Sequence, residues 1–554
     1  MSNVVDLAAN AVRSYGKNSY IPKPFEHIWT CDTGELVPGF MTIKVNPGST
    51  WKLTTSIMAR LNTSRFPTIA RGWIEYAWFY VPHMQIWDHW DQLMGENKES
   101  AWVSQTTYSV PKVEIPAGTV IQNGTFLDHI GWPTEVGDFQ ASALKLRAYL
   151  WVCDQFYRDQ NIEEPIVLDG WTNDSNITYV TNGNYKTGGT LYHINRKADY
   201  FSTALPEPLK GPDVLIPLGA TAPVTNTIEY SNPDNILQRV VSTTNNNVSP
   251  ATGQLTYIVR DPNNAEVSGF KMQQDGPFIN VDTSHTLKST GIADLSQSGT
   301  NIYAIREGAR TIQIFERDAR SGTRAPEMLW ARWGVEVDPL EMGRPRLLNM
   351  GRFPIVFEQV EQTSATDTDS PQGTLTAFGY TNNREENGTF SFKYAGTLMC
   401  LVAIRFEHKY QYGIPNEDLK FDRFDFWHPE FAGLGDQPIY DAEIYATGGA
   451  NGTITTKSIF GYTTRGAEYK NFPSIISGQI RSNYAQSLDY VHMADKYNSL
   501  PTLSPAWMKE NADNVDRTIF VTSNITKQWL VDMVIEMEIT DTIPLYDIPG
   551  IDRI

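Results

Sequence analysis

The order of apolar and polar residues predicts a chain that begins and ends in β-strands. Three early strands are predicted at 36–45, 51–57 and 73–81, where apolar residues alternate with polar ones or form short runs. Pro47 and Gly48 mark a turn between the first two strands. Both alternating sets of residues in the third strand are apolar. This pattern predicts that protein covers both faces of that strand.

The second half of the chain returns to β-type patterns after a helical region. Helical periodicity predicts helices at 85–95 and 140–158, and again at 300–335, where the segment 316–327 ends one helix and starts another. Strands are predicted again at 352–361, 373–380, 390–406, 517–522 and 529–540. Strands, inserted helices and closing strands in this order fit an antiparallel sandwich with long connections.

Two segments differ from the rest of the chain in composition. Residues 1–30 form a polar arm with one short predicted helix, which the prolines at 22 and 24 end. Residues 225–299 are rich in Asn, Ser and Thr, with short alternating pieces at 255–259 and 278–281. This composition predicts a small β-rich insertion at the surface. The chain over 31–554 is predicted to be a single domain that contains the insertion.

Large aromatic residues gather around the end of the third predicted strand. Trp78 lies in that strand, and Trp87 and Trp90 lie on the apolar stripe of the helix predicted at 85–95. Rings of this size carry much of the energy of a core or an interface. Neither a nucleophile nor a cluster of charges accompanies them. The pattern is typical of a building block rather than a catalyst, and it leaves a core role and an interface role equally open for these tryptophans.

The charge balance argues against a chain that neutralises nucleic acid by itself. The 554 residues include 45 Lys and Arg but 63 Asp and Glu, which gives a net charge of −18. A protein that neutralises a phosphate backbone is usually basic. Arg13, Lys17 and Lys23 on the N-terminal arm are the candidates for local phosphate contacts. The three cysteines are far apart and form no CxxC pair, so neither a disulfide framework nor a zinc site is predicted.

The residue patterns of common catalytic and metal sites are absent from the sequence. There is no GxxxxGK[ST] phosphate loop, no GxSxG nucleophile elbow and no HExxH zinc motif. His83 and His89 are six residues apart, which places them on different faces of a helix. Carboxylate pairs such as 163–164 and 422/425 are expected by chance among 63 acidic residues. We therefore predict no enzymatic activity, no cofactor and no bound metal, and the N-terminus shows no secretion signal.

Six segments resemble, in the same order, the major capsid proteins of the Microviridae, which are small single-stranded DNA phages. The resemblance is strongest to the gokushovirus-like branch of the family. It includes FYVPHMQIWDHWDQLMG within the first segment and IFERDARSGTRAPEML as the third. The segments are 79–102, 198–224, 314–329, 422–446, 460–483 and 515–524.

The resemblance implies a fold and a set of partners. The implied fold is an eight-stranded antiparallel jelly roll of the viral capsid type, mainly β, with long loop insertions and several short helices. Sixty copies would form a T=1 icosahedral shell with five-, three- and two-fold contacts around circular single-stranded DNA. The implied partners are an internal scaffolding protein, a small basic DNA-binding protein and a DNA pilot protein, with assembly in the host bacterial cytoplasm. The arm at 1–30 would then face the interior of the virion.

The insertion at 225–299 matches no segment of the family, although it lies between matching segments. The resemblance implies a surface protrusion at the three-fold axes, which would meet a host surface receptor, with a glycan as one candidate. The alternative is a secreted or virion-associated β-sandwich protein that binds or hydrolyses glycans. It would need a cleft with paired carboxylates and usually a secretion route. A receptor-binding phage spike, the third possibility, usually shows repeats or a trimerisation stalk.

Overall fold

The computed structural model divides the chain into two compact units. It describes residues 19–97, 108–167, 170–212, 214, 224–230, 236–239, 254–260, 266–273, 287–293, 302–361, 375–448, 458–520 and 527–543. The first unit combines Met1–Lys210 with Phe315–Ile554, and the second is Gly211–Ile314. The insertion predicted at 225–299 lies within the second unit.

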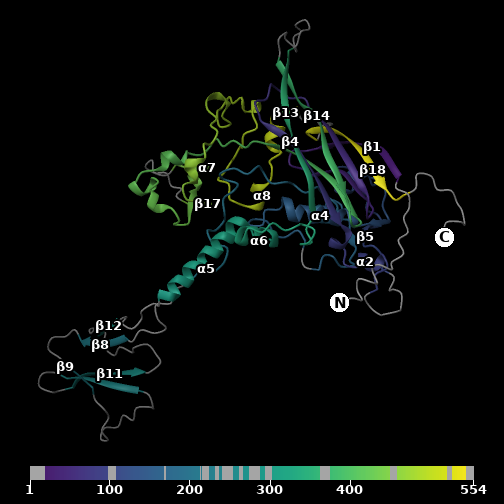
Figure 1. Ribbon diagram of the computed structural model, residues 1–554. Helices are drawn as coiled ribbons and strands as arrows, with labels where there is room; N and C mark the ends of the chain where they lie inside the picture. Colours follow the sequence, from purple (N-terminus) through teal and green to yellow (C-terminus); the bar gives the residue numbers. More distant parts are fainter. Residues whose placement is uncertain are drawn as a thin grey trace. The chain divides into compact units, whose positions relative to one another are not determined.

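Eight long antiparallel strands form the framework of the first unit (Figure 1). Their bounds are β1 Ser19–Cys31, β2 Val37–Val45, β3 Thr50–Leu61, β4 Gly72–Pro82, β13 Arg346–Glu361, β14 Leu375–Ser391, β15 Gly396–Phe406 and β18 Trp529–Asp541. They follow the order β1-β18-β3-β14-β13-β4-β15-β2. This order gives one layer of β1, β18, β3 and β14 and a second layer of β13, β4, β15 and β2. The predicted eight-stranded antiparallel jelly roll is confirmed.

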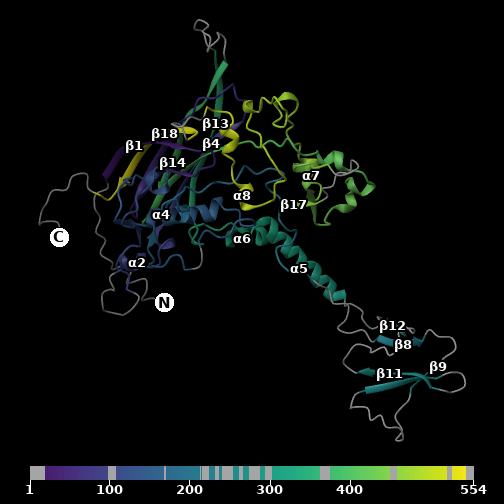
Figure 2. The same cartoon turned by 180° about the vertical axis from the view of Figure 1, so that it is seen from behind.

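Strand β13 connects the two layers. Over 346–355 it pairs with β4 in the second layer, and over 356–361 it pairs with the first residues of β14. The remainder of β14, over 380–391, pairs with β3 in the first layer. A single hairpin therefore joins both layers, and Figure 2 shows it from behind.

The core lies between the layers and contains a fully satisfied polar network. Trp78 of β4 donates from Nε1 to Oγ1 of Thr55 on β3 at 3.1 Å. The Thr55 hydroxyl donates in turn to Oδ1 of Asn387 on β14 at 2.5 Å, and the Asn387 amide donates to the Tyr76 hydroxyl at 2.8 Å. All four side chains are buried. Because each polar group has a partner, burial of these groups ties the two layers together without leaving an unpaired donor.

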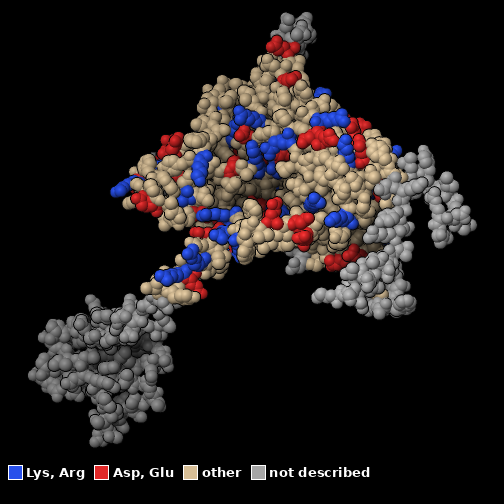
Figure 3. All heavy atoms as spheres, viewed as in Figure 1, with Lys and Arg blue, Asp and Glu red and all other residues tan. Residues whose placement is uncertain are grey.

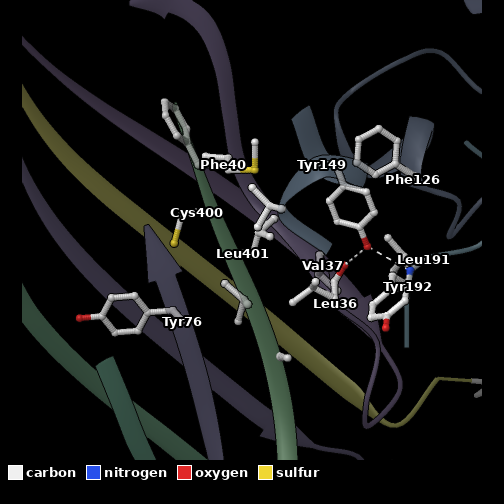
Figure 4. Close-up of a cluster of buried hydrophobic side chains, with 14 of the residues drawn as sticks. Leu36, Val37, Phe40, Tyr76, Phe126, Tyr149, Leu191, Tyr192, Cys400 and Leu401 are labelled. Carbon is white, nitrogen blue, oxygen red and sulfur yellow. Dashed lines mark hydrogen bonds between the residues drawn. The ribbon is translucent and has the colours of Figure 1, made fainter. Parts of the chain in front are cut away.

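Strand β15 is buried on both faces because helix α4 Leu144–Val152 packs on the outside of the second layer. The Tyr149 hydroxyl donates to the carbonyl of Leu36 at 2.8 Å and accepts the backbone N–H of Tyr192 at 3.0 Å. Figure 4 shows Tyr149 and Phe126 on one side of β2 and β15, and Tyr76 and Phe40 on the other. The apolar run at 394–404 is thus a central strand, as its composition predicts.

Shorter elements fill the connections. The small sheets of the first unit are β6 Phe139–Ser142, β5 Lys112–Ile115 and β7 Ile177–Thr178, and β16 Asp436–Tyr440 with β17 Ile459–Thr464. The second unit contains β8 Val224–Tyr230, β9 Ile236–Arg239, β10 Gln254–Arg260, β11 Glu266–Gln273 and β12 Leu287–Ala293. The other helices are α2 Trp90–Leu93, α3 Phe126–His129, α5 Ile302–Ser321, α6 Ala325–Trp333, α7 Asp441–Ile444, α8 Pro505–Met508 and α9 Asp513–Asp516. The break predicted between two helices at 316–327 is confirmed.

The prediction of a polar arm over 1–30 needs correction. Residues 19–30 belong to β1, which pairs in regular register with β18 at the edge of the first layer. Pro22 and Pro24 are two residues apart, so both nitrogens point to the same side of the strand. An edge strand tolerates proline where the nitrogen faces away from its neighbour. The predicted helix near residues 7–12 lies outside the described residues.

Two other local predictions are wrong. The helix predicted at 85–95 is reduced to a 3₁₀ turn at His83–Gln85 and the single turn of α2. Contacts to the loop at 172–174 replace helical hydrogen bonds there, since the Asp88 N–H donates to the carbonyl of Thr172. The strand predicted at 517–522 is wrong in its described part: the short helix α9 ends at Asp516, and a turn with one isolated bridge at Ile519 follows. The short piece at 278–281 lies outside the described residues.

Candidate assembly surfaces

The outer face of the first layer presents charged side chains to solvent. Lys52 on β3 lies 3.3 Å from Glu386 on β14 and 4.0 Å from Glu538 on β18. Arg384 on β14 pairs with Glu536 on β18 at 2.5 Å. Exposed ion pairs of this kind contribute little to stability. This face therefore differs from the outside of the second layer, where α4 and its loops bury β15.

The predicted genome-facing basic residues are only partly within the described chain. Lys23 is exposed on the edge strand β1, opposite Met537 of β18. Arg13 and Lys17 lie outside the described residues. Phosphate contact by these three residues therefore stays a prediction.

The three predicted tryptophans lie in different environments. Trp78 and Trp87 are both fully buried within the chain. Trp87 donates from Nε1 to Oδ1 of Asp174 at 2.7 Å, and Trp90 is half-buried against the ring of His83, with ring centroids 4.2 Å apart. A side chain that its own chain covers completely has no surface left for a neighbour. Of the three, Trp90 alone keeps surface for a contact with another molecule.

The largest group of exposed aromatic side chains in the described residues lies elsewhere, in residues 415–485, which we name the aromatic lobe. It contains α7 and β17 (Figure 1). Phe424 is 71% exposed, Phe472 91% and Ile475 75%. The further exposed apolar side chains of the lobe are Phe421, Phe426, Trp427, Leu434, Tyr469 and Tyr484. The aromatic residues at 421–431 can be recognised in the sequence. Their exposure depends on the tertiary structure, and the periodicity of the sequence does not predict it.

The exposed rings of the lobe are held in place by polar contacts beneath them. The Trp427 ring packs over Gly466, where a Cβ would lie 3.2 Å from the indole ring. The backbone N–H of Trp427 donates to the Tyr469 hydroxyl at 3.1 Å. The Lys420 ammonium lies 4.0 Å above the Tyr469 ring. The hydrogen bond from Lys420 lowers the pKa of the Tyr469 hydroxyl. Asp425 closes the turn that carries Phe424 by accepting the N–H groups of residues 421 and 422.

A buried charge network lies where the chain leaves β15 toward the lobe. His408 contacts Asp495 through Nδ1 at 2.9 Å and Glu510 through Nε2 at 3.2 Å, and Arg196 lies 3.3 Å from Asp495. Burial alone would lower the pKa of His408, but the charges of Asp495 and Glu510 raise it to about 10. The imidazolium and Arg196 in turn hold the pKa of Asp495 well below its usual range, against the effect of burial. Two cations thus balance two carboxylates, as buried charges require.

The residues considered as catalytic or metal-binding have structural partners. His83 contacts the Thr397 hydroxyl at 3.2 Å, whereas His89 contacts Asp174 at 2.8 Å, so the two rings belong to different contacts. Burial lowers the pKa of His83 to about 4. Glu163 accepts from Tyr192 and Lys509, while the pair at 422/425 caps a 3₁₀ turn. Within the ranges described above, no three His, Cys, Asp or Glu side chains are grouped as metal ligands.

A pocket of about 530 Å³ lies among the loop at 195–205, β17 and the end of α5. Its two carboxylates are already engaged, since Asp436 pairs with Arg320 and Asp159 accepts the N–H of Asn161. The face in Figure 3 is hollowed near its middle, with basic side chains around the hollow. Glycoside hydrolysis needs two carboxyl groups free to act on a sugar. The pocket therefore does not favour the glycan-hydrolysing alternative.

The fold and the exposed surfaces define a class of protein. Two facing four-stranded antiparallel layers with long insertions are the jelly roll of viral capsid subunits. The chain belongs to the family described as "Capsid protein (F protein)", whose model matches residues 11–551. None of the helices in the described part of the chain is long and apolar enough to cross a membrane.

The chain is similar to three phage proteins, each named Capsid protein VP1. The protein of Spiroplasma virus 4 is 31% identical over 556 residues, covering 97% of both chains. The protein of Bdellovibrio phage phiMH2K is 32% identical over 88% of this chain and 87% of its own. The protein of Chlamydia phage 1 is 29% identical over 95% and 94%. The resemblance to Microviridae capsid proteins is confirmed, and the chain is a structural component of a virion that associates with itself.

Proposed function

We propose that sixty copies of this chain assemble into a T=1 icosahedral shell that encloses a circular single-stranded DNA genome. The jelly-roll topology carries this proposal, together with family membership along almost the entire chain. A closed shell needs several distinct surface patches on each copy, because five-, three- and two-fold contacts all have to form. The chain offers such patches in the charged outer face of the first layer and in the aromatic lobe.

The proposed partners follow from the charge of the chain. With a net charge of −18, the protein leaves neutralisation of the genome to a small basic DNA-binding protein. Arg13, Lys17 and Lys23, the last of which lies on β1, would supply only local phosphate contacts at the interior of the shell. An internal scaffolding protein and a DNA pilot protein complete the proposed assembly, which takes place in the cytoplasm of the host bacterium.

The insertion at 225–299 is proposed to form a protrusion at the three-fold axes and to meet a surface receptor of the host. Its position in a separate compact unit supports this proposal, since a unit with its own strands can vary without disturbing the jelly roll. The protein is proposed to act through geometry alone, with neither catalysis nor a cofactor.

The mass of purified particles tests the proposal. Sixty chains of 62.4 kDa give a shell of about 3.7 MDa, which multi-angle light scattering measures directly after co-expression with the scaffolding protein. We expect a single species of at least this mass. A chain that stays monomeric in every such extract contradicts the proposed function.

A further inference from the structure

We infer that the aromatic lobe binds a second copy of this chain, and that the lobe of one copy contacts a different surface of the other. The inference rests on the proposed shell, because it assigns one of its contacts to a named region. It goes further by stating which kind of partner covers the lobe and that the lobe meets a surface other than a second lobe.

The exposed apolar area of the lobe matches what a stable contact needs. Eight of its exposed side chains together present on the order of 1,000 Å², since an aromatic side chain offers about 150–250 Å². They are Phe421, Phe424, Phe426, Trp427, Leu434, Tyr469, Phe472 and Ile475. One side of a standard interface buries about 800 Å².

The lobe is also preorganised for binding. The Trp427 ring packs on Gly466, the backbone N–H of Trp427 donates to the Tyr469 hydroxyl, and Lys420 covers the Tyr469 ring from above. Because these rings are already ordered, binding of a partner restricts few additional side chains and costs little conformational entropy. Rigid aromatic anchors surrounded by polar residues are the groups that dominate interface energies.

The charge of the lobe excludes the genome as its occupant. Residues 415–485 contain nine acidic and six basic residues. Asp418, Asp422 and Glu430 are exposed among the rings, whereas Lys420 is held within the lobe by Glu468. Arg423 is also exposed and lies 5.8 Å from the centre of the Phe424 ring, so the exposed rim has an acidic excess with one cation among the rings. Proteins that stack single-stranded bases on aromatic rings line those rings with basic groups. The acidic excess disfavours phosphates, so a protein surface is the partner that fits.

The same charge selects the surface that the lobe meets. A contact between the lobes of two copies would oppose acidic residues to each other. Like charges across an interface are costly. A contact between the lobe and a different, less acidic surface of the neighbouring copy avoids this repulsion.

A double variant tests whether the lobe drives assembly. We expect Phe424→Ser with Phe472→Ser to lower the shell yield by at least roughly tenfold, because hot-spot rings contribute about 2 kcal/mol or more each. The melting temperature of the unassembled chain should stay unchanged, since both rings are exposed. The matched control is Ile28→Ser on β1, which removes an equally exposed apolar side chain outside the lobe. Shells that form at the wild-type yield from the double variant overturn the inference.

A thiol probe tests which partner covers the lobe. Cys31, Cys153 and Cys400 are all buried, so Phe472→Cys introduces an isolated exposed thiol. We expect this thiol to react with maleimide in the unassembled chain and to be protected in shells, whether these are empty or filled with DNA. Reaction in both shells at the unassembled rate overturns the inference. Protection that depends on the DNA identifies the genome as the occupant and also overturns it.

Oxidation of the same variant shows whether two lobes meet. A contact between the lobe and a different surface keeps the introduced thiols of two copies apart, so oxidised shells should contain no disulfide-linked dimers on a non-reducing gel. Dimers in high yield would show that two lobes meet and would overturn the inferred contact between different surfaces. A wild-type chain that forms no particles contradicts the proposed shell itself, which separates that outcome from a failure of the interface.

Discussion

The strands around Trp78 and the aromatic lobe use the same residue types in opposite ways. In the core, Trp78 and Tyr76 are buried, and their polar atoms are paired with Thr55 and Asn387. In the lobe, Phe424 and Phe472 point to solvent and are phenylalanines, which have no polar atom to pair. The core rings stabilise the folded chain, whereas the exposed rings of the lobe are available to bind a partner.

The largest expected effect comes from removing a core ring. Trp78→Ala should lower the free energy of unfolding by about 3–5 kcal/mol, because it leaves a cavity and removes the indole donor from the buried Thr55 hydroxyl. Urea denaturation of the unassembled chain measures this loss. Trp330→Ala removes a ring that is exposed on α6 and serves as the control, with an expected change below about 0.5 kcal/mol. Equal losses for both variants would remove the distinction between buried and exposed rings.

The network at the base of the lobe should be almost as important. His408→Gln leaves Asp495 and Glu510 short of one positive charge, which should cost about 3 kcal/mol near pH 6. Because the pKa of His408 is raised to about 10, its stabilisation is fully present below pH 6.5 and is lost as the pH rises through 10. The difference in stability between the wild type and the variant should therefore shrink from pH 6 to pH 10.

Thermal unfolding at several pH values between 6 and 10 tests this expectation. His428→Gln is the matched control, since that histidine is partly buried in the lobe and contacts the backbone carbonyl of Arg423 and the rings of Phe424 and Phe431. A constant difference across the range would show that His408 is not charged in the folded chain.

A smaller loss is expected from the hydroxyl that links the layers. Thr55→Val keeps the shape of the side chain but leaves Nε1 of Trp78 and Oδ1 of Asn387 without their partner. The cost of such buried unpaired groups is about 1–3 kcal/mol. Thr55→Ser retains the hydroxyl and should lose less than Thr55→Val in the same denaturation experiment. The opposite order would mean that the methyl group, rather than the hydrogen bonds, matters at this position.

The smallest effect is expected in the lobe. Phe421→Ser should change the unfolding free energy by less than about 0.5 kcal/mol, because the ring is 70% exposed in the single chain. Phe126→Ser removes a fully buried phenylalanine and should be severely destabilising by comparison. A large loss for Phe421→Ser would mean that the lobe rings stabilise the fold and would weaken the contrast with the core.

The sequence is most informative where one structural pattern dominates. Alternation and apolar runs predict β2, β4 and β18 to within one residue of their bounds in the structure. They also predict β3 and β15, although β3 continues four residues beyond the predicted end and β15 begins six residues after the predicted start. The break between α5 and α6 is equally clear, because Gly322 adopts a φ of 91° there. In each of these cases local preference and tertiary packing favour the same conformation.

The sequence is least informative where tertiary contacts override local pattern. The stripe that includes Trp87 is typical of a helix, but hydrogen bonds to Asp174 and Thr172 hold this segment in turns instead. Pro22 and Pro24 favour a non-regular arm, whereas pairing with β18 makes a strand. The ring-rich segment of the lobe looks like core packing in the sequence. The exposure of this segment depends on whether other parts of the folded chain pack against it, and a local sequence pattern does not contain that information.

The prolines of β1 have a consequence for a protein made in large numbers. An unpaired edge strand can form hydrogen bonds with a strand of another chain, and repeated pairing of this kind produces long filaments. Pro22 and Pro24 remove two donors from this margin, so an approaching strand finds gaps in the row of hydrogen bonds. Crowded, newly made subunits are thereby discouraged from forming fibres and remain available for a closed particle.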